Sequence, residues 1–513
     1  MVKRSDREPR VQVEPFDQYN RQLVDNVRPP DWLNPRPPGR YHLVVVGGGT
    51  GGLVSASIAA GLGARVALVE RHLMGGDCLN YGCVPSKAVL SAARAWQAAA
   101  EASRVFGGPR VVGTGDFSQV MERMRRLRAG ISRIDGAARF RELGVDVYLG
   151  EGRFTGKDAL EVDGRSLKFR RAVIAAGGRP AVPPVPGLET SGYLTNETIF
   201  SLTELPQSLL VLGAGPVGSE LASAFSRFGS KVTVVTRHSH ILPREDPEGA
   251  RIVERAMERD GVRFFHRATP IRSELHDGRR VLSFERDGRV EQVSAERILV
   301  AVGRVPNVED LGLEAAGVRA DRQGVVVDDR LRTSNRRIYA VGDIASPHKF
   351  THVADAQARI VIGNAFFFGL GGGRASRLVL PRTTYTSPEV ARVGLTEGEA
   401  VEEGHEVHTI TVPLHDVDRA VLEGQESGFF RVHLRRGSDR MLGATLIAEH
   451  AGDMIGEIAL AMTAGIGLAK VSSTIHPYPT QGEVFRKAAD AWRKTRLTPR
   501  AKRAFDWFFR MTR

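Results

Sequence analysis

The fold is decided by the stretch Leu43-Val44-Val45-Val46-Gly47-Gly48-Gly49-Thr50-Gly51-Gly52, an apolar run that leads directly into a glycine-rich turn. An Ala-rich, helix-like segment follows, and residues 65–70 then read as a second strand that ends in Glu70. Gly47, Gly49 and Gly52 permit a tight turn and let the backbone approach a pyrophosphate at a helix N-terminus. An acid about 20 residues further on accepts hydrogen bonds from an adenosine ribose. The stretch therefore predicts a dinucleotide-binding unit.

The same pattern occurs a second time. An apolar run at residues 209–212 leads into Gly213-Ala214-Gly215-Pro216-Val217-Gly218, then a helix to about Phe228 and a strand at Lys231–Val235. Gly213, Gly215 and Gly218 repeat the glycine spacing of the first unit. Two such units in one chain predict an α/β protein with two Rossmann-like domains.

The cysteines point to redox chemistry. The 513 residues contain only Cys78 and Cys83, five positions apart. Two cysteines leave none for structural disulfides elsewhere or for a cysteine metal cage, and the 14 histidines show no metal-ligand spacing, so we expect no resident metal. The spacing favours a pair that cycles between dithiol and disulfide. Two inert, buried thiols are the alternative, and the neighbouring dinucleotide unit argues against them.

Two dinucleotide sites beside one thiol pair suggest an electron relay. One cofactor would deliver a hydride, a second would accept it, and the disulfide would take the electrons. A flavin can stand between a hydride donor and a thiol pair, so we expect FAD in the first site and a nicotinamide in the second.

Composition agrees with a soluble α/β enzyme. The length supports three to four domains, and 42% of the residues are hydrophobic. No run of 18 apolar residues and no secretory signal is visible, and thiols that must be reduced suit a cytoplasmic location. The net charge of +13 would permit nucleic-acid binding, but no recognition motif supports it, so we expect no nucleic-acid partner.

The cysteine segment Gly75-Gly76-Asp77-Cys78-Leu79-Asn80-Tyr81-Gly82-Cys83-Val84-Pro85-Ser86-Lys87 resembles the active-site segment of the flavoprotein disulfide reductases. That family includes dihydrolipoamide dehydrogenase, glutathione reductase and mercuric reductase. The resemblance runs from about residue 41 to 490. It includes four further motifs: Ala175-Ala176-Gly177-Gly178-Arg179-Pro180, Val302-Gly303-Arg304-Val305-Pro306-Asn307, Tyr339-Ala340-Val341-Gly342-Asp343 and Tyr385-Thr386-Ser387-Pro388-Glu389-Val390-Ala391-Arg392-Val393-Gly394.

The resemblance implies an α/β fold with two Rossmann-like dinucleotide-binding domains and a C-terminal α+β dimerisation domain, and therefore a homodimer. The expected units are an N-terminal extension (1–40), the first part of the FAD-binding domain (41–190), the NAD(P)H-binding domain (191–304), the second part of the FAD-binding or central domain (305–378), the dimerisation domain (379–491) and a basic, aromatic tail (492–513).

The resemblance also implies a role for each site residue. Cys83 would lie beside the flavin, and Cys78 would be the interchange thiol that attacks the acceptor. Lys87 would approach the flavin and pair with Glu220, and its charge would favour the Cys83 thiolate. Asp343 would bind the flavin ribityl chain, and Gly177, Gly303 and Gly342 belong to the cofactor-binding motifs.

The second nucleotide site favours NADPH. NAD sites place an acid at the end of the second strand to hold the ribose hydroxyls. This chain instead has Val235-Thr236-Arg237-His238 there. Arg237 could pair with a 2′-phosphate, and no carboxylate would repel it. We therefore expect NADPH rather than NADH.

The segment Thr474-Ile475-His476-Pro477-Tyr478-Pro479-Thr480-Gln481-Gly482-Glu483 departs from most of the family. Dihydrolipoamide dehydrogenase and glutathione reductase carry, from the partner subunit, a histidine five residues before a glutamate, and here that position is Tyr478. Tyrosine is a poor base at pH 7. His476 could substitute, since alternate residues of an extended segment point to the same side. A Pro-Tyr-x-Thr segment resembles mercuric reductase, where the tyrosine helps hold the metal. The vicinal cysteine pair at the end of that family is missing.

The expected activity is an FAD-containing, NADPH-dependent disulfide reductase that is mercuric reductase-like. We rank its acceptor as a disulfide, quinone or other small electrophile first, mercuric ion second and lipoamide third. Tyr478 and Glu483 of the other subunit would line the entrance. Dihydrolipoyl dehydrogenase activity is one alternative function, and a flavoprotein subunit docked to a partner or membrane through residues 493–513 is another.

Both ends of the chain lie outside the resemblance. Residues 1–40 are polar and rich in proline, and they read as an extended arm. Residues 493–513 carry eight basic residues against Asp506, interleaved with Phe505, Trp507, Phe508 and Phe509. A terminal helix that docks its aromatic side chains on the body is favoured over a contact with a membrane surface or acidic partner.

Overall fold

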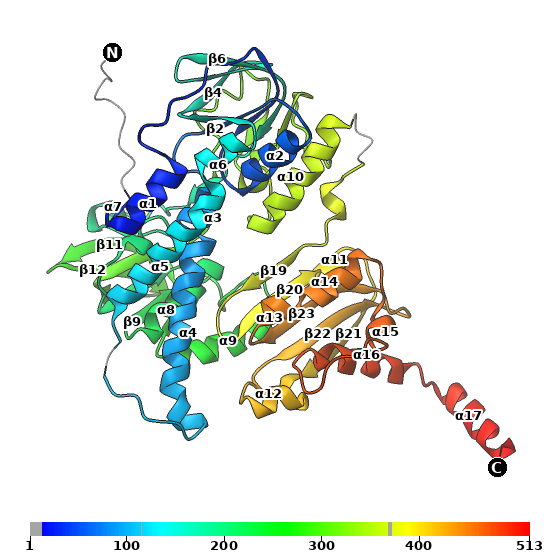
Figure 1. Ribbon diagram of the computed structural model, residues 1–513. Coiled ribbons are helices and arrows are strands. Elements are labelled where there is room, and N and C mark those ends of the chain that lie inside the picture. The colour runs from blue at the N-terminus through cyan, green and yellow to red at the C-terminus, as the bar shows by residue number, and fades with distance from the viewer. Residues whose placement is uncertain (1–12, 114, 368–371, 513) are drawn as a thin grey trace.

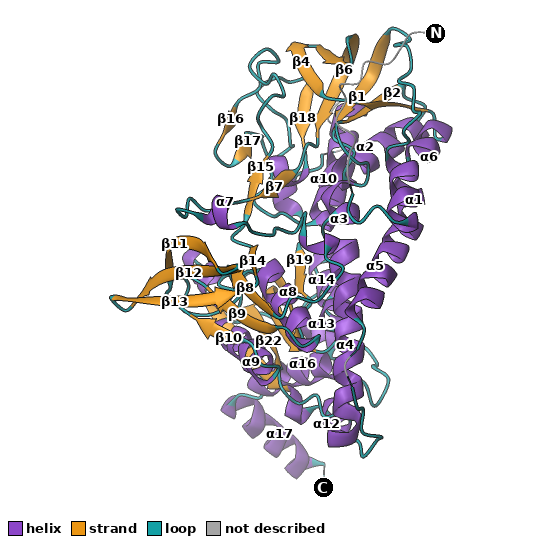
Figure 2. Cartoon of the chain, turned by 90° about the vertical axis from the view of Figure 1, so that its left-hand side faces the viewer, coloured by secondary structure: helices purple, strands orange, loops and turns teal. Residues whose placement is uncertain are grey.

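The computed structural model describes residues 13–113, 115–367 and 372–512, and it is organised around three sheets (Figure 1). Two of the sheets are built on parallel strands, and the third is antiparallel. Figure 1 and Figure 2 show the first sheet at one end of the molecule and the second and third sheets beside each other at the other end, with α4 and α5 running along one side. The predicted fold class, with two Rossmann-like domains and a C-terminal α+β domain, is confirmed.

The first sheet has seven strands in the order β3-β2-β1-β6-β5-β4, with β18 paired to β6. The strand β1 is buried on both faces over residues 43–46, which explains the continuous apolar run there. β18 returns to this sheet from more than 160 residues further along the chain than β6. The strands are β1 (Arg40–Val46), β2 (Val66–Glu70), β3 (Val145–Leu149), β4 (Gly152–Gly156), β5 (Ala159–Val162), β6 (Arg165–Ile174) and β18 (Ile338–Ala340).

The second sheet repeats this arrangement with the order β10-β9-β8-β14. In both sheets the strand before the glycine turn lies between its successor and a much later strand, so the chain changes direction there and leaves a crevice for a nucleotide. The strands are β8 (Ser208–Leu212), β9 (Lys231–Val235), β10 (Arg263–Phe265) and β14 (Arg297–Val300). A three-stranded antiparallel sheet lies beside it: β11 (Thr269–His276), β12 (Arg279–Arg286) and β13 (Arg289–Ala295).

The third sheet has the order β19-β20-β23-β22-β21 and is antiparallel throughout. Its strands are β19 (Pro381–Thr384), β20 (Glu389–Gly394), β21 (Val407–Pro413), β22 (Phe429–Arg435) and β23 (Met441–Ala448). Two short pairs complete the strands: β7 (Gly178–Pro180) with β15 (Arg304–Pro306), and β16 (Ala320–Asp321) with β17 (Gly324–Val325).

Helices cover the sheets and join them. The helices up to the second sheet are α1 (Gln18–Val27), α2 (Thr50–Gly61), α3 (Gly76–Asn80), α4 (Cys83–Val105), α5 (Phe117–Ser132), α6 (Ala137–Glu142) and α7 (Leu188–Ser191). The later ones are α8 (Pro216–Arg227), α9 (Pro247–Arg259), α10 (Thr351–Phe366), α11 (Glu397–Glu402), α12 (Asp418–Leu422), α13 (Ala451–Met454), α14 (Gly456–Thr463), α15 (Leu468–Val471), α16 (Glu483–Thr495) and α17 (Pro499–Met511). No helix in the described ranges is long and apolar enough to cross a membrane.

One hydrophobic cluster fixes α4 against the rest of the molecule. Val89 and Leu90 of α4 share this buried cluster with Phe225 of α8, Val390 of β20 and Phe429 of β22. α4 begins at Cys83, so the cluster holds one of the two thiols in place relative to both the second and the third sheet.

The expectation that residues 1–40 form an extended arm is wrong for residues 18–27; residues 28–39 contain no helix or strand, and residues 1–12 lie outside the described residues. Residues 18–27 form α1, which packs against α5 and buries Leu23 and Val27. Arg128 of α5 donates to Asn20 Oδ1 and to the carbonyl of Asn80, both at 2.7 Å. The nearby prolines had favoured an extended segment over this short amphipathic helix. Asn80 lies between the two cysteines, so α1 supports the cysteine loop through Arg128.

We expect Leu23→Ala to lower the free energy of unfolding by about 2–5 kcal/mol, because Leu23 is fully buried. The matched control is Leu33→Ala, since Leu33 is 82% exposed and should cost less than about 0.5 kcal/mol. Chemical unfolding of both variants measures the difference. Equal stabilities would contradict the placement of α1 in the core.

Candidate active site

One cavity of about 1420 Å³ brings the two glycine turns and the cysteine pair together. Most of the site residues expected from the sequence line it: Gly47, Gly49, Glu70, Cys78, Cys83, Lys87, Gly177, Gly213, Gly215, Glu220, Arg237, Gly303, Gly342 and Asp343. Gly52 and Gly218, the third glycine of each turn, instead lie behind the cavity wall. The described residues include no group of three or more His, Cys, Asp or Glu side chains placed to hold a metal ion.

The first glycine turn is shaped for a close-lying ligand. A Cβ at Gly52 would come within 1.8 Å of the Gly47 carbonyl oxygen, so α2 can pack against the turn only with glycine there. Gly47 has φ +108°, which other residues rarely adopt. At Gly49 a Cβ would meet nothing closer than Gly76 Cα at 3.6 Å, which leaves the backbone open to the cavity at the start of α2. These are the three glycine roles of a pyrophosphate-binding turn.

The second turn has the same construction. A Cβ at Gly218 would lie 2.1 Å from the Gly213 carbonyl oxygen, and Gly213 has φ +107°. Gly215 has open space where its Cβ would be. Each turn therefore pairs two glycines that the backbone requires with one that a ligand requires.

The cysteine loop packs directly on the first turn. A Cβ at Gly76 would lie 2.7 Å from Gly49 Cα, so the two backbones touch. Cys78 lies on α3, and Cys83 is the first residue of α4. Both thiols are free and line the cavity.

The two thiols differ electrostatically. A hydrogen bond with Cys78, together with the Thr351 hydroxyl and the Lys87 charge, lowers the pKa of Cys83. Cys83 Sγ lies 3.3 Å from Thr351 Oγ1, and the N-terminus of α4 also favours a thiolate. The same hydrogen bond with Cys83, followed by burial, raises the pKa of Cys78. The first proton to leave the pair is therefore lost from Cys83.

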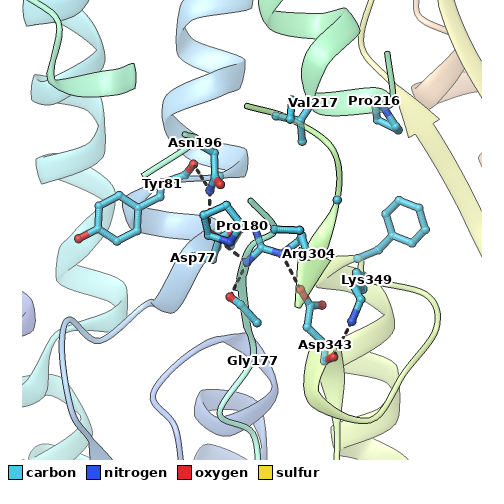
Figure 3. A pocket seen from close by; sticks show the side chains of 18 of the residues that line it. Asp77, Tyr81, Gly177, Pro180, Asn196, Pro216, Val217, Arg304, Asp343 and Lys349 are labelled. Atoms are coloured by element: carbon cyan, nitrogen blue, oxygen red, sulfur yellow. Dashed lines mark hydrogen bonds and ion pairs between the residues drawn. The ribbon is translucent and has the colours of Figure 1, made fainter. Parts of the chain in front are cut away.

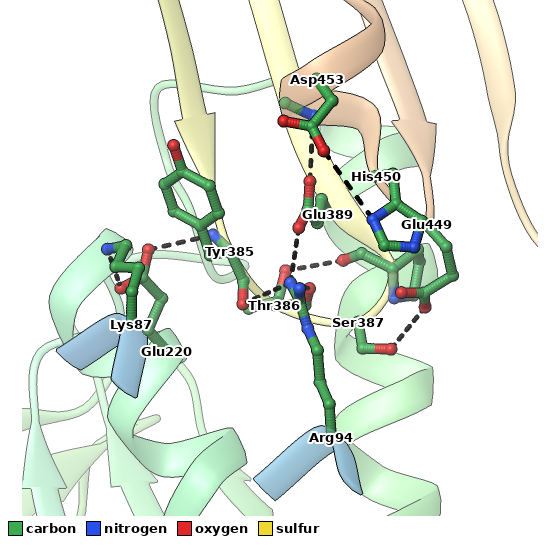
Figure 4. Close-up of polar contacts among 12 residues, drawn as sticks. Lys87, Arg94, Glu220, Tyr385, Thr386, Ser387, Glu389, Glu449, His450 and Asp453 are labelled. Atoms are coloured by element: carbon green, nitrogen blue, oxygen red, sulfur yellow. Dashed lines mark hydrogen bonds and ion pairs between the residues drawn. The ribbon is translucent and has the colours of Figure 1, made fainter. Parts of the chain in front are cut away.

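Lys87 and Glu220 form an ion pair at the junction of three domains (Figure 4). Lys87 Nζ of α4 donates to Glu220 Oε2 of α8 at 2.8 Å. Burial alone would lower the pKa of Lys87, but the Glu220 carboxylate outweighs burial and raises it above the ordinary value. Lys87 is therefore a cation at neutral pH, one helical turn from Cys83.

A third member of this arrangement, Tyr385, was not predicted from the sequence. Its ring centroid lies 4.4 Å from Lys87 Nζ, and its backbone N–H donates to Glu220 Oε1 at 3.0 Å. Tyr385 follows β19, almost 300 residues after Lys87. The sequence placed it only at the start of the dimerisation domain, and a contact over that separation leaves no local pattern.

Arg304 links the cysteine loop to Asp343 (Figure 3). Its guanidinium lies 3.3 Å from Asp77 Oδ1 and 3.1 Å from Asp343 Oδ2. Burial raises the pKa of Asp343, against the opposing effect of Arg304. Lys349 Nζ also donates to the Asp343 carbonyl at 2.8 Å. The sequence indicates Arg304 only as part of a motif, because its contacts with Asp77 and Asp343 join residues that lie far apart in the chain.

The charged residue at or after the second strand of each glycine-turn unit differs between the two sites: it is an acid in the first and a base in the second. Glu70 is buried at the end of β2, where burial raises its pKa and its carboxylate accepts hydrogen bonds from the N–H groups of Gly48 and His72 at 2.5 and 2.6 Å. Arg237 takes the corresponding place after β9, where it is exposed and lines the cavity.

His476, Tyr478 and Glu483 do not line the cavity in the described chain. The expectation that His476 and Tyr478 point to the same side is wrong. The His476 side chain is 7% exposed, with Nε2 3.0 Å from Glu457 Oε1 and Nδ1 3.1 Å from the Thr474 carbonyl. Tyr478 is 71% exposed and donates to Asp418 Oδ2 at 2.8 Å. Glu483 is buried against Arg486 at the start of α16.

Comparisons with known proteins agree with this site. The family model described as pyridine nucleotide-disulphide oxidoreductase matches residues 41–358, and the dimerisation domain of the same family matches residues 380–489. The chain is 34% identical to a mercuric reductase of Staphylococcus aureus, over 88% of this chain and 82% of that protein. It is also 34% identical to a dihydrolipoyl dehydrogenase of Bacillus subtilis, over 88% and 97% of the two chains.

Solved structures give the same result. LpdA of Mycobacterium tuberculosis superposes with a TM-score of 0.80 at 27% identity, over 88% of this chain and 99% of that one. The HOCl-induced flavoprotein disulfide reductase RclA of Escherichia coli superposes with a TM-score of 0.77 at 28% identity, with the same coverage. The family is FAD-dependent and uses pyridine nucleotides, and the dimerisation domain supports a homodimer. The chain belongs to the pyridine nucleotide-disulphide oxidoreductases, the flavoprotein disulfide reductases that its cysteine segment resembles.

Proposed function

We propose that this protein is an NADPH-dependent, FAD-containing reductase that uses the Cys78–Cys83 pair to reduce a small disulfide, a quinone or another electrophile. One observation carries the proposal: a single cavity contains both nucleotide turns, the thiol pair and the Lys87–Glu220 ion pair. A protein that only bound nucleotides would have no need of a cationic lysine beside a thiol of lowered pKa.

The residues of the first site fit FAD. The open backbone at Gly49 would take the pyrophosphate, Glu70 the adenosine ribose, and Asp343 the ribityl chain, with Gly177 and Gly342 in the adjoining wall. Bound FAD would supply hydride acceptance from the nicotinamide and two electrons for the disulfide. Gly213, Gly215 and Gly303 would hold the nicotinamide coenzyme in the second site.

The thiols have complementary tasks in the reductive step. Cys78 sulfur attacks one sulfur of an acceptor disulfide and releases the other as a thiol. Cys83 sulfur then attacks Cys78 sulfur, which releases the second thiol and leaves a Cys78–Cys83 disulfide. Two electrons and two protons have then passed to the acceptor. The lowered pKa of Cys83 keeps it ready as a thiolate, and the raised pKa of Cys78 means that its proton must be removed at the moment of attack.

The source of that proton transfer bears on the acceptor. In the resemblance, dihydrolipoamide dehydrogenase uses a histidine–glutamate dyad for this proton transfer, and this chain lacks that dyad. His476 already has partners within its own chain at both ring nitrogens. Tyr478, in contrast, is exposed and could line the entrance of the other subunit with Glu483 near it. This arrangement supports ranking lipoamide last, behind mercuric ion, which two soft thiolates could hold as a substrate.

The acceptor is tested by following NADPH oxidation by the FAD-loaded enzyme with small disulfides, quinones, a mercuric–thiol complex and lipoamide. We expect turnover with at least one disulfide, quinone or mercuric acceptor, and its loss in Cys78→Ser, which removes the attacking sulfur. Unchanged turnover of Cys78→Ser with every acceptor would contradict the dithiol mechanism. Faster turnover with lipoamide than with all others would contradict the ranking.

Arg237→Gln should lower kcat/KM for NADPH by about tenfold to a hundredfold and leave NADH nearly unchanged, because a charge-assisted bond to the 2′-phosphate is lost. The matched control is Arg251→Gln, an exposed arginine on α9 outside the cavity wall. Steady-state kinetics with both coenzymes measures the effect. A parent enzyme that prefers NADH by more than about tenfold would contradict the coenzyme assignment.

Tyr385→Leu should raise the pH at which Cys83 becomes a thiolate and slow turnover by about threefold to tenfold. The cation–π contact holds the Lys87 ammonium in place, and Lys87 lowers the Cys83 pKa, so a less fixed lysine lets that pKa return toward its ordinary value. Tyr385→Phe keeps the ring and the backbone N–H and is the matched control.

The readout is the pH dependence of alkylation of Cys83 in the Cys78→Ser background, where one thiol titrates. An equal pH midpoint in the Leu and Phe variants would show that the Tyr385 ring does not position Lys87.

A further inference from the structure

Helix α17 covers nothing in the described chain. None of its residues is buried. Its large apolar side chains are all at least half exposed: Phe505 52%, Trp507 63%, Phe508 53%, Phe509 59% and Met511 67%. Figure 1 shows the helix standing away from the body beyond α16. The expectation that this segment docks its aromatic side chains on the body is therefore wrong for the single chain.

The helix is nevertheless well formed at its start. Thr498 Oγ1 accepts a hydrogen bond from the Ala501 N–H at 3.2 Å, and Pro499 occupies the first turn. A helix of 13 residues without tertiary packing is only marginally stable in water. A surface that covered the apolar side of α17 would therefore stabilise the helix.

The side chains of α17 divide into two faces. At 100° per residue, Ala501, Ala504, Phe505, Phe508, Phe509 and Met511 lie on one side of the helix. Arg503, Asp506 and Arg510 lie on the opposite side, and Arg500, Lys502 and Trp507 lie at the boundaries between the two faces. A basic face opposite an aromatic face is typical of a helix that lies in the headgroup region of a membrane.

We propose that α17 is an interfacial helix that binds the enzyme to an anionic lipid surface. The segment 493–513 carries eight basic residues against one acid, which attracts anionic headgroups. The same local charge disfavours the equivalent segment of a second copy as the occupant, because two such basic segments would repel each other. Phe505 and Phe508 enter the apolar boundary, and Lys502 and Arg503 contact headgroups.

The test measures binding of the FAD-loaded, full-length enzyme to vesicles. Vesicles of phosphatidylcholine with about 30 mol% phosphatidylserine are compared with pure phosphatidylcholine by cosedimentation. We expect at least about tenfold tighter binding to the anionic vesicles, and weaker binding as salt is raised. Tryptophan emission should shift to the blue on binding in the parent enzyme but much less in Trp507→Phe, because Trp507 would leave water.

Two double variants separate the faces. Phe505→Ser/Phe508→Ser removes apolar contacts, and Lys502→Glu/Arg503→Glu reverses charge, and each should weaken binding to anionic vesicles by about tenfold or more. Matched controls use exposed residues elsewhere, Leu275→Ser/Val290→Ser and Arg251→Glu/Arg289→Glu, and should bind like the parent. NADPH oxidation in solution should be the same in all of them.

Two results would overturn the proposal. One is equal sedimentation of the parent and both α17 variants with anionic vesicles. The other is a parent enzyme that binds no vesicles while Phe505→Ser/Phe508→Ser changes its oligomeric state in analytical ultracentrifugation. The second result would show that the apolar face covers another copy of the chain.

Discussion

The ion pair between Lys87 and Glu220 is the contact on which the rest of the site depends, because it joins α4, which begins at Cys83, to α8, which follows the second glycine turn. Lys87 lies on the helix that starts at Cys83, Glu220 follows the second glycine turn, and the Tyr385 loop of the third sheet closes on both. A second link reinforces this junction: Arg94 of α4 pairs with Glu389 of β20 at 2.5 Å (Figure 4). The Lys87 cation, which lowers the pKa of Cys83, is thus held between the second and the third sheet. A small shift between these two sheets would therefore change the pKa of Cys83.

Local patterns were enough to predict the fold class, the two glycine turns and the thiol pair that line the cavity. The glycine turns are read from sequence because each glycine answers a steric demand within a few residues, as the 1.8 Å approach at Gly52 and the 2.1 Å approach at Gly218 show. The cysteine spacing is equally local. Tyr385, Thr351 and Arg304 were not predicted as parts of the site, because each acts through a contact with a residue far away in the chain. The helix α1 was missed for another reason, since the five prolines that follow it between residues 29 and 38 suggested an extended segment.

The chain departs from its family at two places near the C-terminus, the segment around Tyr478 and the helix α17. His476 contacts Glu457, and the exposed Tyr478 donates to Asp418, so Tyr478 is the more exposed of the two side chains. Beyond it, α17 adds an aromatic and basic face that the matched family domains do not include, since they end at residue 489. The proposed chemistry and the proposed attachment to a lipid surface therefore rest on separate parts of the chain and can fail separately.

The most direct test of the central claim is to count free thiols in the FAD-loaded enzyme before and after anaerobic addition of NADPH. The oxidised enzyme should show no reactive thiol, and NADPH should expose both, because Cys78 and Cys83 are the only cysteines in the chain. A flavin that NADPH reduces while the thiol count stays unchanged would contradict the account, since electrons would then reach the acceptor without the cysteine pair.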